Sequence, residues 1–349
     1  MRTVLSISVL VFSFGAFAQQ RTQYSQYMNN GYLINPAVTG IENYADIKIG
    51  HVNQWVGFDG SPTSTYLSLH SPLGFIKDSV IEVEPTIPAL PMRGRATNAI
   101  ITKSTDEKVE NLSNAPERKI RHGIGTYVYN ETAGPLANRG MAVSYAFHYN
   151  LGDYNIPAGL ALGVLNYEFN PDELKLVNNA DATFGVTTMN DYMPNMNLGL
   201  MLYSDKLFFG ISSRQLLGNK FSVTNEYTTL SSQLSRHYFV SGGYRFLLMD
   251  NQLQLVPSLM FRYVSPVPPS IDINVQATYK DLLMFGVSYR HKDAIVAMFG
   301  VNFYKRFSLS YSYDFTTSAL AKYSSGTHGI VLGVKINDGS SLPKRTYFW

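Results

Sequence analysis

Strict alternation of apolar and polar side chains organises most of this chain. Between residues 306 and 315, one parity holds Phe307, Leu309, Tyr311, Tyr313 and Phe315, and the other holds Ser308, Ser310, Ser312 and Asp314. This period of two predicts a β-strand, because successive side chains of a strand point to opposite faces. About fourteen segments share the pattern, near 45–55, 62–72, 121–130, 139–151, 156–167, 194–204, 205–213, 236–249, 252–264, 269–279, 281–290, 293–304, 305–316 and 327–337.

The composition of the two faces indicates which kind of β protein this is. The polar parity consists mostly of Ser, Asn, Gly, Thr and Gln with isolated charges such as Arg262 and Arg290, and the apolar parity carries Tyr and Phe at strand ends. A soluble sandwich, which is the alternative, exposes a charged face, whereas a lipid-facing apolar parity and a small polar lumen are typical of an outer-membrane barrel. We therefore predict an all-β, transmembrane, antiparallel up-and-down β-barrel of about 14 strands over residues 45–337. Pro257 cannot donate to a closed ladder, so we expect a bulge there.

The lengths of the connections support an up-and-down barrel. Those at 152–155, 204–206, 249–252, 280–281 and 305 are tight, whereas the intervening connections include 168–192, 216–235 and 316–326, which are mostly long and polar. Short periplasmic turns and longer external loops are the usual arrangement when both termini are periplasmic.

One long stretch departs from this arrangement. Residues 74–119 fall on the predicted periplasmic side and contain seven positive and seven negative side chains, with four prolines. This polar insertion between the second and third strands is expected to be a solvated segment. The alternative is a docking segment for a periplasmic partner.

Composition narrows the possible classes of protein. Charged residues make up 15% of the chain, against about 25% in soluble domains, while aromatic residues make up 13%. Beyond the first 18 residues no apolar run approaches the roughly 20 residues that a spanning helix needs, so the bilayer contact is assigned to strands. A net charge of +3 without a basic stripe predicts no nucleic-acid partner. The absence of cysteine excludes disulfides, thiolate metal sites and cysteine nucleophiles.

The two ends of the chain are predicted to be segments separate from the barrel strands. Residues 1–18 combine an N-terminal Arg2, an apolar stretch and small residues before a cleavage site between Ala18 and Gln19, which predicts a signal peptide; the alternative is a buried helix. Residues 19–44 form an N-terminal segment. Residues 338–349 form a C-terminal tail, either a frayed terminus or an aromatic end for barrel assembly.

Catalytic motifs are absent from the sequence. The seven histidines have no metal-ligand spacing, and the chain contains no H-E-x-x-H, G-x-S-x-G, P-loop or dinucleotide fingerprint. We therefore predict no catalytic, metal or cofactor-binding residues, and no enzymatic activity. The weaker alternatives are a passive porin or solute channel and, third, an outer-membrane hydrolase that pairs His148 with a strand serine.

Local sequences resemble one known family. The N-terminal half contains Tyr-Ser-Gln-Tyr-Met at 24–28, Asn-Pro-Ala-Val-Thr-Gly at 35–40, Asn-Gln-Trp-Val-Gly-Phe-Asp-Gly-Ser-Pro at 53–62 and Leu-His-Ser-Pro-Leu at 69–73. The C-terminal half contains Val-Pro-Ser at 256–258, Asp-Ile-Asn at 272–274, Gly-Val-Ser-Tyr-Arg at 286–290, Tyr-Ser-Tyr-Asp at 311–314 and Tyr-Ser-Ser-Gly-Thr-His at 323–328. In this order they are similar to the PorP/SprF family of type IX secretion system membrane proteins. The 74–119 insertion and the C-terminal tail depart from the family pattern.

The resemblance implies a function in secretion. It implies a non-enzymatic component of the cell outer membrane that assists export or cell-surface attachment of large cargo proteins, including gliding adhesins, by binding their C-terminal domain. Other type IX secretion components in the periplasm and outer membrane are the implied partners. Trp55, Phe58 and Asp59 lie near the predicted external end of the first hairpin and are candidate partner contacts; the alternative for them is a structural turn with a girdle tryptophan.

Overall fold

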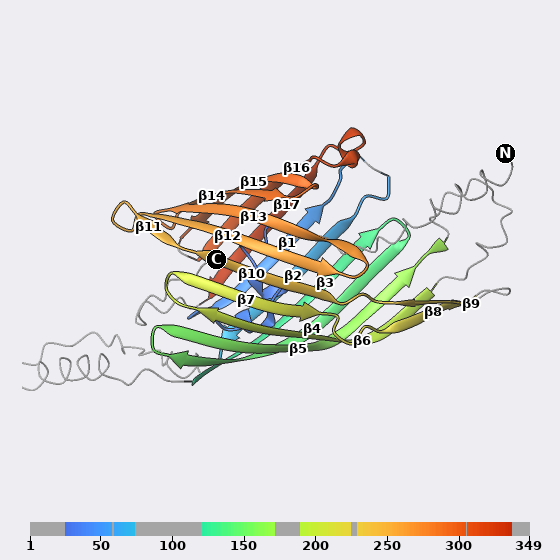
Figure 1. The fold of residues 1–349 in the computed structure, drawn as a ribbon, viewed down its shortest axis with the longest axis horizontal. Coiled ribbons are helices and arrows are strands. Elements are labelled where there is room, and N and C mark those ends of the chain that lie inside the picture. Colours follow the sequence, from blue (N-terminus) through green and yellow to red (C-terminus); the bar gives the residue numbers. More distant parts are fainter. Residues whose placement is uncertain are drawn as a thin grey trace, which may run out of the picture.

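The strands close into a single barrel. The computed structural model describes residues 25–57, 59–73, 120–171, 189–224, 229–304 and 306–336. In these ranges the barrel strands are β1 (Ala45–Asn53), β2 (Thr63–Pro72), β3 (Ile120–Ala133), β4 (Leu136–Leu151), β5 (Tyr154–Phe169), β6 (Met189–Tyr203), β7 (Leu207–Arg214), β10 (His237–Tyr244), β11 (Phe246–Leu248), β12 (Leu253–Val264), β13 (Val267–Tyr279), β14 (Leu283–Arg290), β15 (Ala294–Phe303), β16 (Phe307–Thr316) and β17 (Thr327–Ile336). The predicted barrel is confirmed: β10 and β11 form two parts of one strand, which gives 14 strands around a closed ring (Figure 1).

Closure comes from pairing between the first and last strands. β1 pairs antiparallel with β17 from Ala45 opposite Ile336 to Asn53 opposite His328, and every other barrel strand pairs with its neighbours in the chain. A closed ring satisfies the backbone N–H and C=O groups within the wall, which a bilayer requires because it offers no water to an open edge.

The two faces of the wall are distributed as the alternation predicts. In β13 and β14, Ile273, Phe285 and Val287 point outward with about half of their surface exposed, while Asn274 and Ser288 face inward and are buried. Lipid rather than water covers the outer face of such a barrel. Among the described residues, no helix is long and apolar enough to cross a membrane.

The predicted bulge at Pro257 is wrong. Pro257 stays in register with Val275 of β13, and the β12–β13 register shifts further along, between Arg262 and Val264. On the other side of β12, the pairing with β10 and β11 keeps one register, but it is interrupted at Arg245, between those two strands. Because proline lacks an N–H, the sheet omits pairing at this point instead of inserting a residue.

The connections lie at two ends of the barrel. At the first, which we call the turn end, the β4–β5, β6–β7, β11–β12, β13–β14 and β15–β16 connections are tight, as predicted. At the other, the loop end, the connections after β1, β5, β7 and β16 are long, but those after β3, β12 and β14 are only two or three residues, so the prediction of mostly long loops holds in part. The connection after β7 contains an unpredicted hairpin, β8 (Lys220–Thr224) and β9 (Thr229–Gln233).

Several predicted segments lie outside the described residues. These are the signal peptide at 1–18 with its cleavage site between Ala18 and Gln19, the 74–119 insertion, and the 338–349 tail. The described strands on either side of the insertion, β2 and β3, reach it at the turn end, where Pro72 pairs with Gly123.

Candidate functional site

The N-terminal segment fills the lumen of the barrel. Residues 25–44, which we call the plug, run inside the ring of strands as the dark-blue chain of Figure 1. Their apolar side chains form one buried cluster with lumen residues of the wall, and the members contributed by the plug are Tyr27, Met28, Tyr32, Leu33, Ala37, Val38 and Ile41. The lumen therefore has a core of its own, which the alternation of the strands does not predict.

Short local hydrogen bonds shape the middle of the plug. Two 3₁₀ turns, η1 (Gly31–Leu33) and η2 (Pro36–Val38), follow one another, and the Asn35 side chain caps η2 by accepting from the N–H of Ala37 at 2.9 Å. Proline suits the first position of such a turn because its missing N–H has no partner there in any case. The same Asn35 amide donates to the carbonyls of Leu200 in β6 and Ile211 in β7 at 3.3 and 3.4 Å.

The small polar residues of the lumen are the partners of the plug. Gln26 donates to the carbonyl of Gly329 at 2.9 Å and to Ser312 at 3.1 Å, Asn30 donates to Ser68 at 2.9 Å, and the Tyr32 hydroxyl lies 2.7 Å from that of Ser144. The polar side chains of the strands, which face the lumen, therefore bind the plug.

Glycines in the wall let the plug approach closely. A Cβ atom added at Gly159 of β5 would overlap the backbone of Pro36, and one added at Gly123 of β3 would overlap the carbonyl of Thr39. Because both contacts are with backbone, they have little room to adjust. At these positions the strand sequence matches the shape of the plug.

The plug crosses the lumen from one end to the other. Ser25 donates to Asp314, near the loop end of β16. At the turn end, Arg121 of β3 donates to Asn43 at 3.1 Å and to the carbonyls of Gly40 and Ile41. The chain therefore enters the barrel at the loop end and leaves it at the turn end, where β1 begins.

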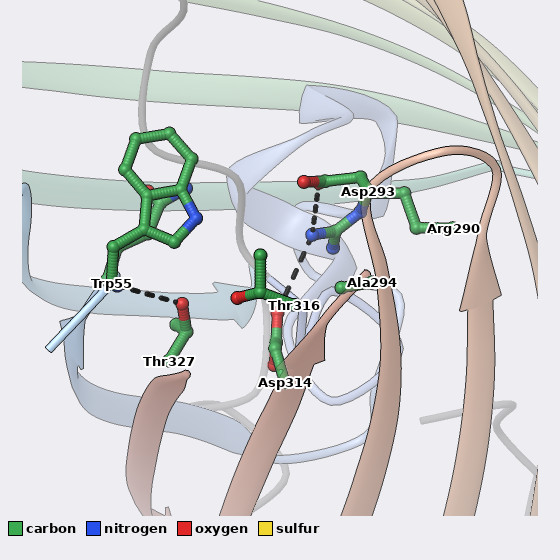
Figure 2. Close-up of a pocket in the computed structure, with 8 residues that line it drawn as sticks. Trp55, Arg290, Asp293, Ala294, Asp314, Thr316 and Thr327 are labelled. Carbon is green, nitrogen blue, oxygen red and sulfur yellow. Dashed lines mark hydrogen bonds and ion pairs between the residues drawn. The ribbon is translucent and has the colours of Figure 1, made fainter. Parts of the chain in front are cut away.

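Buried charges surround the plug at the loop end. Arg262 lies 2.8 Å from Asp272, and Arg290 lies 3.2 Å from Asp293 and 3.5 Å from both Asp272 and Asp314. Figure 2 shows Arg290 between Asp293 and Asp314, in a pocket whose wall also includes Trp55 and Thr327. Removing one partner of a buried network is costly, because the remaining charge has lost its compensation.

Comparison with known proteins then gives the family. The family model described as "Type IX secretion system membrane protein PorP/SprF" matches residues 16–334. The chain belongs to the PorP/SprF family. Membership and the closed barrel together identify an outer-membrane component of the type IX secretion system, as predicted. Comparison with curated proteins gives no match.

Several solved β-barrels resemble this PorP/SprF chain at low identity. The toluene transporter TodX of Pseudomonas putida is 10% identical, with a TM-score of 0.43 over 91% of this chain and 95% of that one. The translocator domain of the autotransporter NalP from Neisseria meningitidis is 8% identical, with a TM-score of 0.37 over 96% and 93%. A porin mutant of Rhodopseudomonas blastica is 9% identical, with a TM-score of 0.31 over 84% and 99%.

The predicted contact residues of the PorP/SprF barrel belong to the β1–β2 connection at the loop end. The N–H of Trp55 donates to Thr327 at 3.1 Å, and the Val56 backbone exchanges hydrogen bonds with Gly326 and Ser325 of the β16–β17 connection at 2.8 and 2.7 Å. Trp55 is half-buried and Asp59 is exposed, whereas Phe58 lies outside the described residues. The structure thus brings two connections together at this place, and partner contact there stays a prediction.

His148 pairs with the plug. Its Nε2 lies 2.8 Å from the carbonyl oxygen of Thr39, and its Nδ1 has no hydrogen-bond partner among the described residues. The neighbouring Ser144 bonds with Tyr32 and Thr39 instead. The Ser/His pair that a hydrolase with His148 requires is therefore not formed here.

Sequence reasoning missed one cluster of polar side chains in the PorP/SprF barrel. Glu42 of the plug, Asp46 of β1 and His70 of β2 meet at the turn end and are fully buried. Burial, with Asp46 close by, raises the pKa of Glu42 to about 8. The signal was weak, because the histidine is distant in sequence and meets the acids only through strand pairing.

Proposed function

We propose that this outer-membrane protein assists the export or cell-surface attachment of large type IX cargo proteins, such as gliding-type adhesins, by binding their C-terminal domain. The observation that carries the proposal is the plug. Because the chain's own residues 25–44 occupy the lumen and bond to the wall on many sides, the barrel acts through its outer surfaces, without catalysis and without conducting cargo.

The plug weighs against the porin alternative. A channel needs an open, water-filled lumen. Here aromatic, aliphatic and amide side chains of the plug pack between β2, β4, β6 and β16. Plugged lumens are known in transporters, so conductance separates the two hypotheses.

The loop end is the proposed cargo-binding surface. The β1–β2 connection is braced by backbone hydrogen bonds to the β16–β17 connection, and this bracing holds the backbone of Trp55 in a fixed position. Recognition by loops on a rigid barrel leaves the membrane band unchanged. We assign Trp55, Phe58 and Asp59 to the contact, with the tryptophan as its apolar anchor.

The turn end is the proposed surface for other secretion components. By the parity of the connections this end faces the periplasm, and the charge-rich 74–119 insertion is attached there. A charged segment of this kind suits a periplasmic protein partner, because mixed charges provide specificity more than affinity.

Binding of a purified cargo C-terminal domain to the detergent-solubilised barrel tests the proposal. Trp55→Ala should weaken binding by about 2 kcal/mol, or roughly thirtyfold in Kd, if the tryptophan is an anchor. Tyr304→Ala is the matched control, because Tyr304 is an exposed aromatic residue at the opposite, turn end of the barrel. This control should bind cargo as the parent does.

Two results would overturn the proposal. The first is a parent barrel that binds no type IX cargo domain in any assay of native membranes or purified protein. The second is a large, steady single-channel current from the intact chain, which would favour the porin. Equal binding by Trp55→Ala and the parent would remove only the assignment of Trp55.

A further inference from the structure

The turn end brings together an imidazole and two carboxylates. β1 and β2 pair so that Asp46 lies directly opposite His70. The plug then places Glu42 Oε2 3.3 Å from His70 Nδ1, while His70 Nε2 lies 3.7 Å from Asp46 Oδ2. We call these three residues the turn-end cluster; it joins the plug to the barrel wall.

Two carboxylate oxygen atoms of the cluster are buried without a hydrogen-bond partner. Glu42, Asp46 and His70 are each no more than 2% exposed. Within the described part of the chain, Glu42 Oε2 and Asp46 Oδ1 accept no hydrogen bond. Buried carboxylate oxygens are almost always satisfied, so both atoms indicate a missing hydrogen-bond donor or cation.

The cations nearby do not neutralise the Glu42 carboxylate. Lys48 Nζ lies 2.7 Å from Asp46 Oδ2, and the Arg121 guanidinium donates to Asn43 and to plug carbonyls. Among the residues that the structure describes, His70 is the one basic side chain within 4.0 Å of the Glu42 carboxylate. A buried carboxylate in this position is costly unless a proton or a metal cation neutralises it.

We propose that the turn-end cluster binds a divalent transition-metal cation of the Zn²⁺ class, which fastens the plug to the wall. One imidazole nitrogen and two carboxylate oxygens suit this class, whereas Ca²⁺ and Mg²⁺ prefer sites made of oxygen alone. Three protein ligands leave a fourth position for water, as in many zinc sites.

The spacing of the donor atoms fits such an ion. One atom from each residue lies within 4.8 Å of the other two. Zinc bonds of about 2.1 Å in tetrahedral geometry place neighbouring ligand atoms about 3.4 Å apart, so a side-chain rotation of Glu42 or Asp46 closes the set. The N–H of Gly40 donates to His70 Nδ1 at 3.2 Å, so a cation that binds this nitrogen replaces that hydrogen bond.

Zinc binding by the full-length chain, purified in detergent and stripped with a chelator, tests the proposal. Calorimetric titration with ZnCl₂, together with metal analysis after dialysis, should give one Zn²⁺ per chain and a higher melting temperature. Glu42→Gln and His70→Gln should each lose this ion, because an amide is a poor replacement for either ligand.

His148→Gln is the matched control. His148 is as buried as His70 and also contacts the plug, through the Thr39 carbonyl, but among the described residues no carboxylate lies within ion-pair distance of it. The control should keep the stoichiometric ion. If His70→Gln does not assemble, the comparison rests on Glu42→Gln, which preserves size.

Two outcomes would overturn the proposal. One is a parent chain that binds no Zn²⁺ and shows no change in melting temperature, which would assign the neutralising role to a proton shared by Glu42 and His70. The other is unchanged binding in Glu42→Gln. Neither readout depends on secretion or on cargo.

Discussion

Tyr32 offers the sharpest test of how the plug is held. Its side chain is 2% exposed, its hydroxyl lies 2.7 Å from that of Ser144, and its ring meets Tyr127 edge-on at 5.8 Å between centroids. If the plug leaves the lumen, this burial and both contacts are lost. Tyr32→Ala should therefore shift the equilibrium between the plugged and the released barrel toward release.

The magnitude follows from the contacts. Removing a fully buried aromatic side chain costs about 4 kcal/mol, which corresponds to about a thousandfold in the release equilibrium. Tyr32→Phe loses only the hydroxyl, and Ser144 keeps a second bond to Thr39 at 3.0 Å. That loss is about 1 kcal/mol, or about fivefold.

Thiol labelling measures this equilibrium directly. The chain has no cysteine, and Ser68, which is 2% exposed, faces Asn30 of the plug. In a Ser68→Cys background the labelling rate reports the fraction of barrels with the plug released. We expect the labelling rate to be highest in Tyr32→Ala, lower in Tyr32→Phe and lowest in the parent. The control Tyr323→Ala, at the exposed loop end, should be labelled at the rate of the parent.

Two results would refute this reasoning. Equal labelling rates in the parent and in Tyr32→Ala, with the barrel still assembled, would mean that the packing of Tyr32 does not hold the plug. A Tyr32→Phe effect as large as that of Tyr32→Ala would assign the free energy to the hydroxyl bond instead of the buried ring.

Three further predictions concern the plug. Deleting residues 25–43 should convert a silent barrel into a conducting one in planar bilayers, whereas persistent silence would mean that the wall side chains close the lumen. Gly159→Val should accelerate Ser68→Cys labelling, because its side chain overlaps the Pro36 backbone; an unchanged rate would show that the plug adapts. An epitope inserted between residues 24 and 25 should be accessible on intact cells and one in the β13–β14 turn should not; the opposite result would reverse the assigned orientation.

Alternation alone predicted the wall of the barrel. The apolar residues of β13, β14 and β16 repeat with a period of two, and this local pattern determines which face meets lipid and which faces the lumen. Strand ends were predicted less well, since β5 extends to Phe169 and β6 begins at Met189, beyond the predicted segments 156–167 and 194–204.

Proline was misjudged for a local reason. From sequence, the missing N–H of Pro257 argues for an extra residue in the strand. Only the assembled sheet shows the other solution, in which the partner strand is interrupted at Arg245 and the register is kept.

The plug and the turn-end cluster were decided by tertiary structure. Residues 25–44 carry no periodic pattern, and their 3₁₀ turns are too short to give one; their burial depends on contacts with strands up to about 300 residues away in sequence, such as Gln26 with Gly329. Likewise, His70 meets Asp46 through strand register and Glu42 through the path of the plug. The sequence by itself determined a membrane wall with a polar interior, because alternation is local. What fills that interior was decided by the closed ring, since only closure brings the strands' polar faces around one segment.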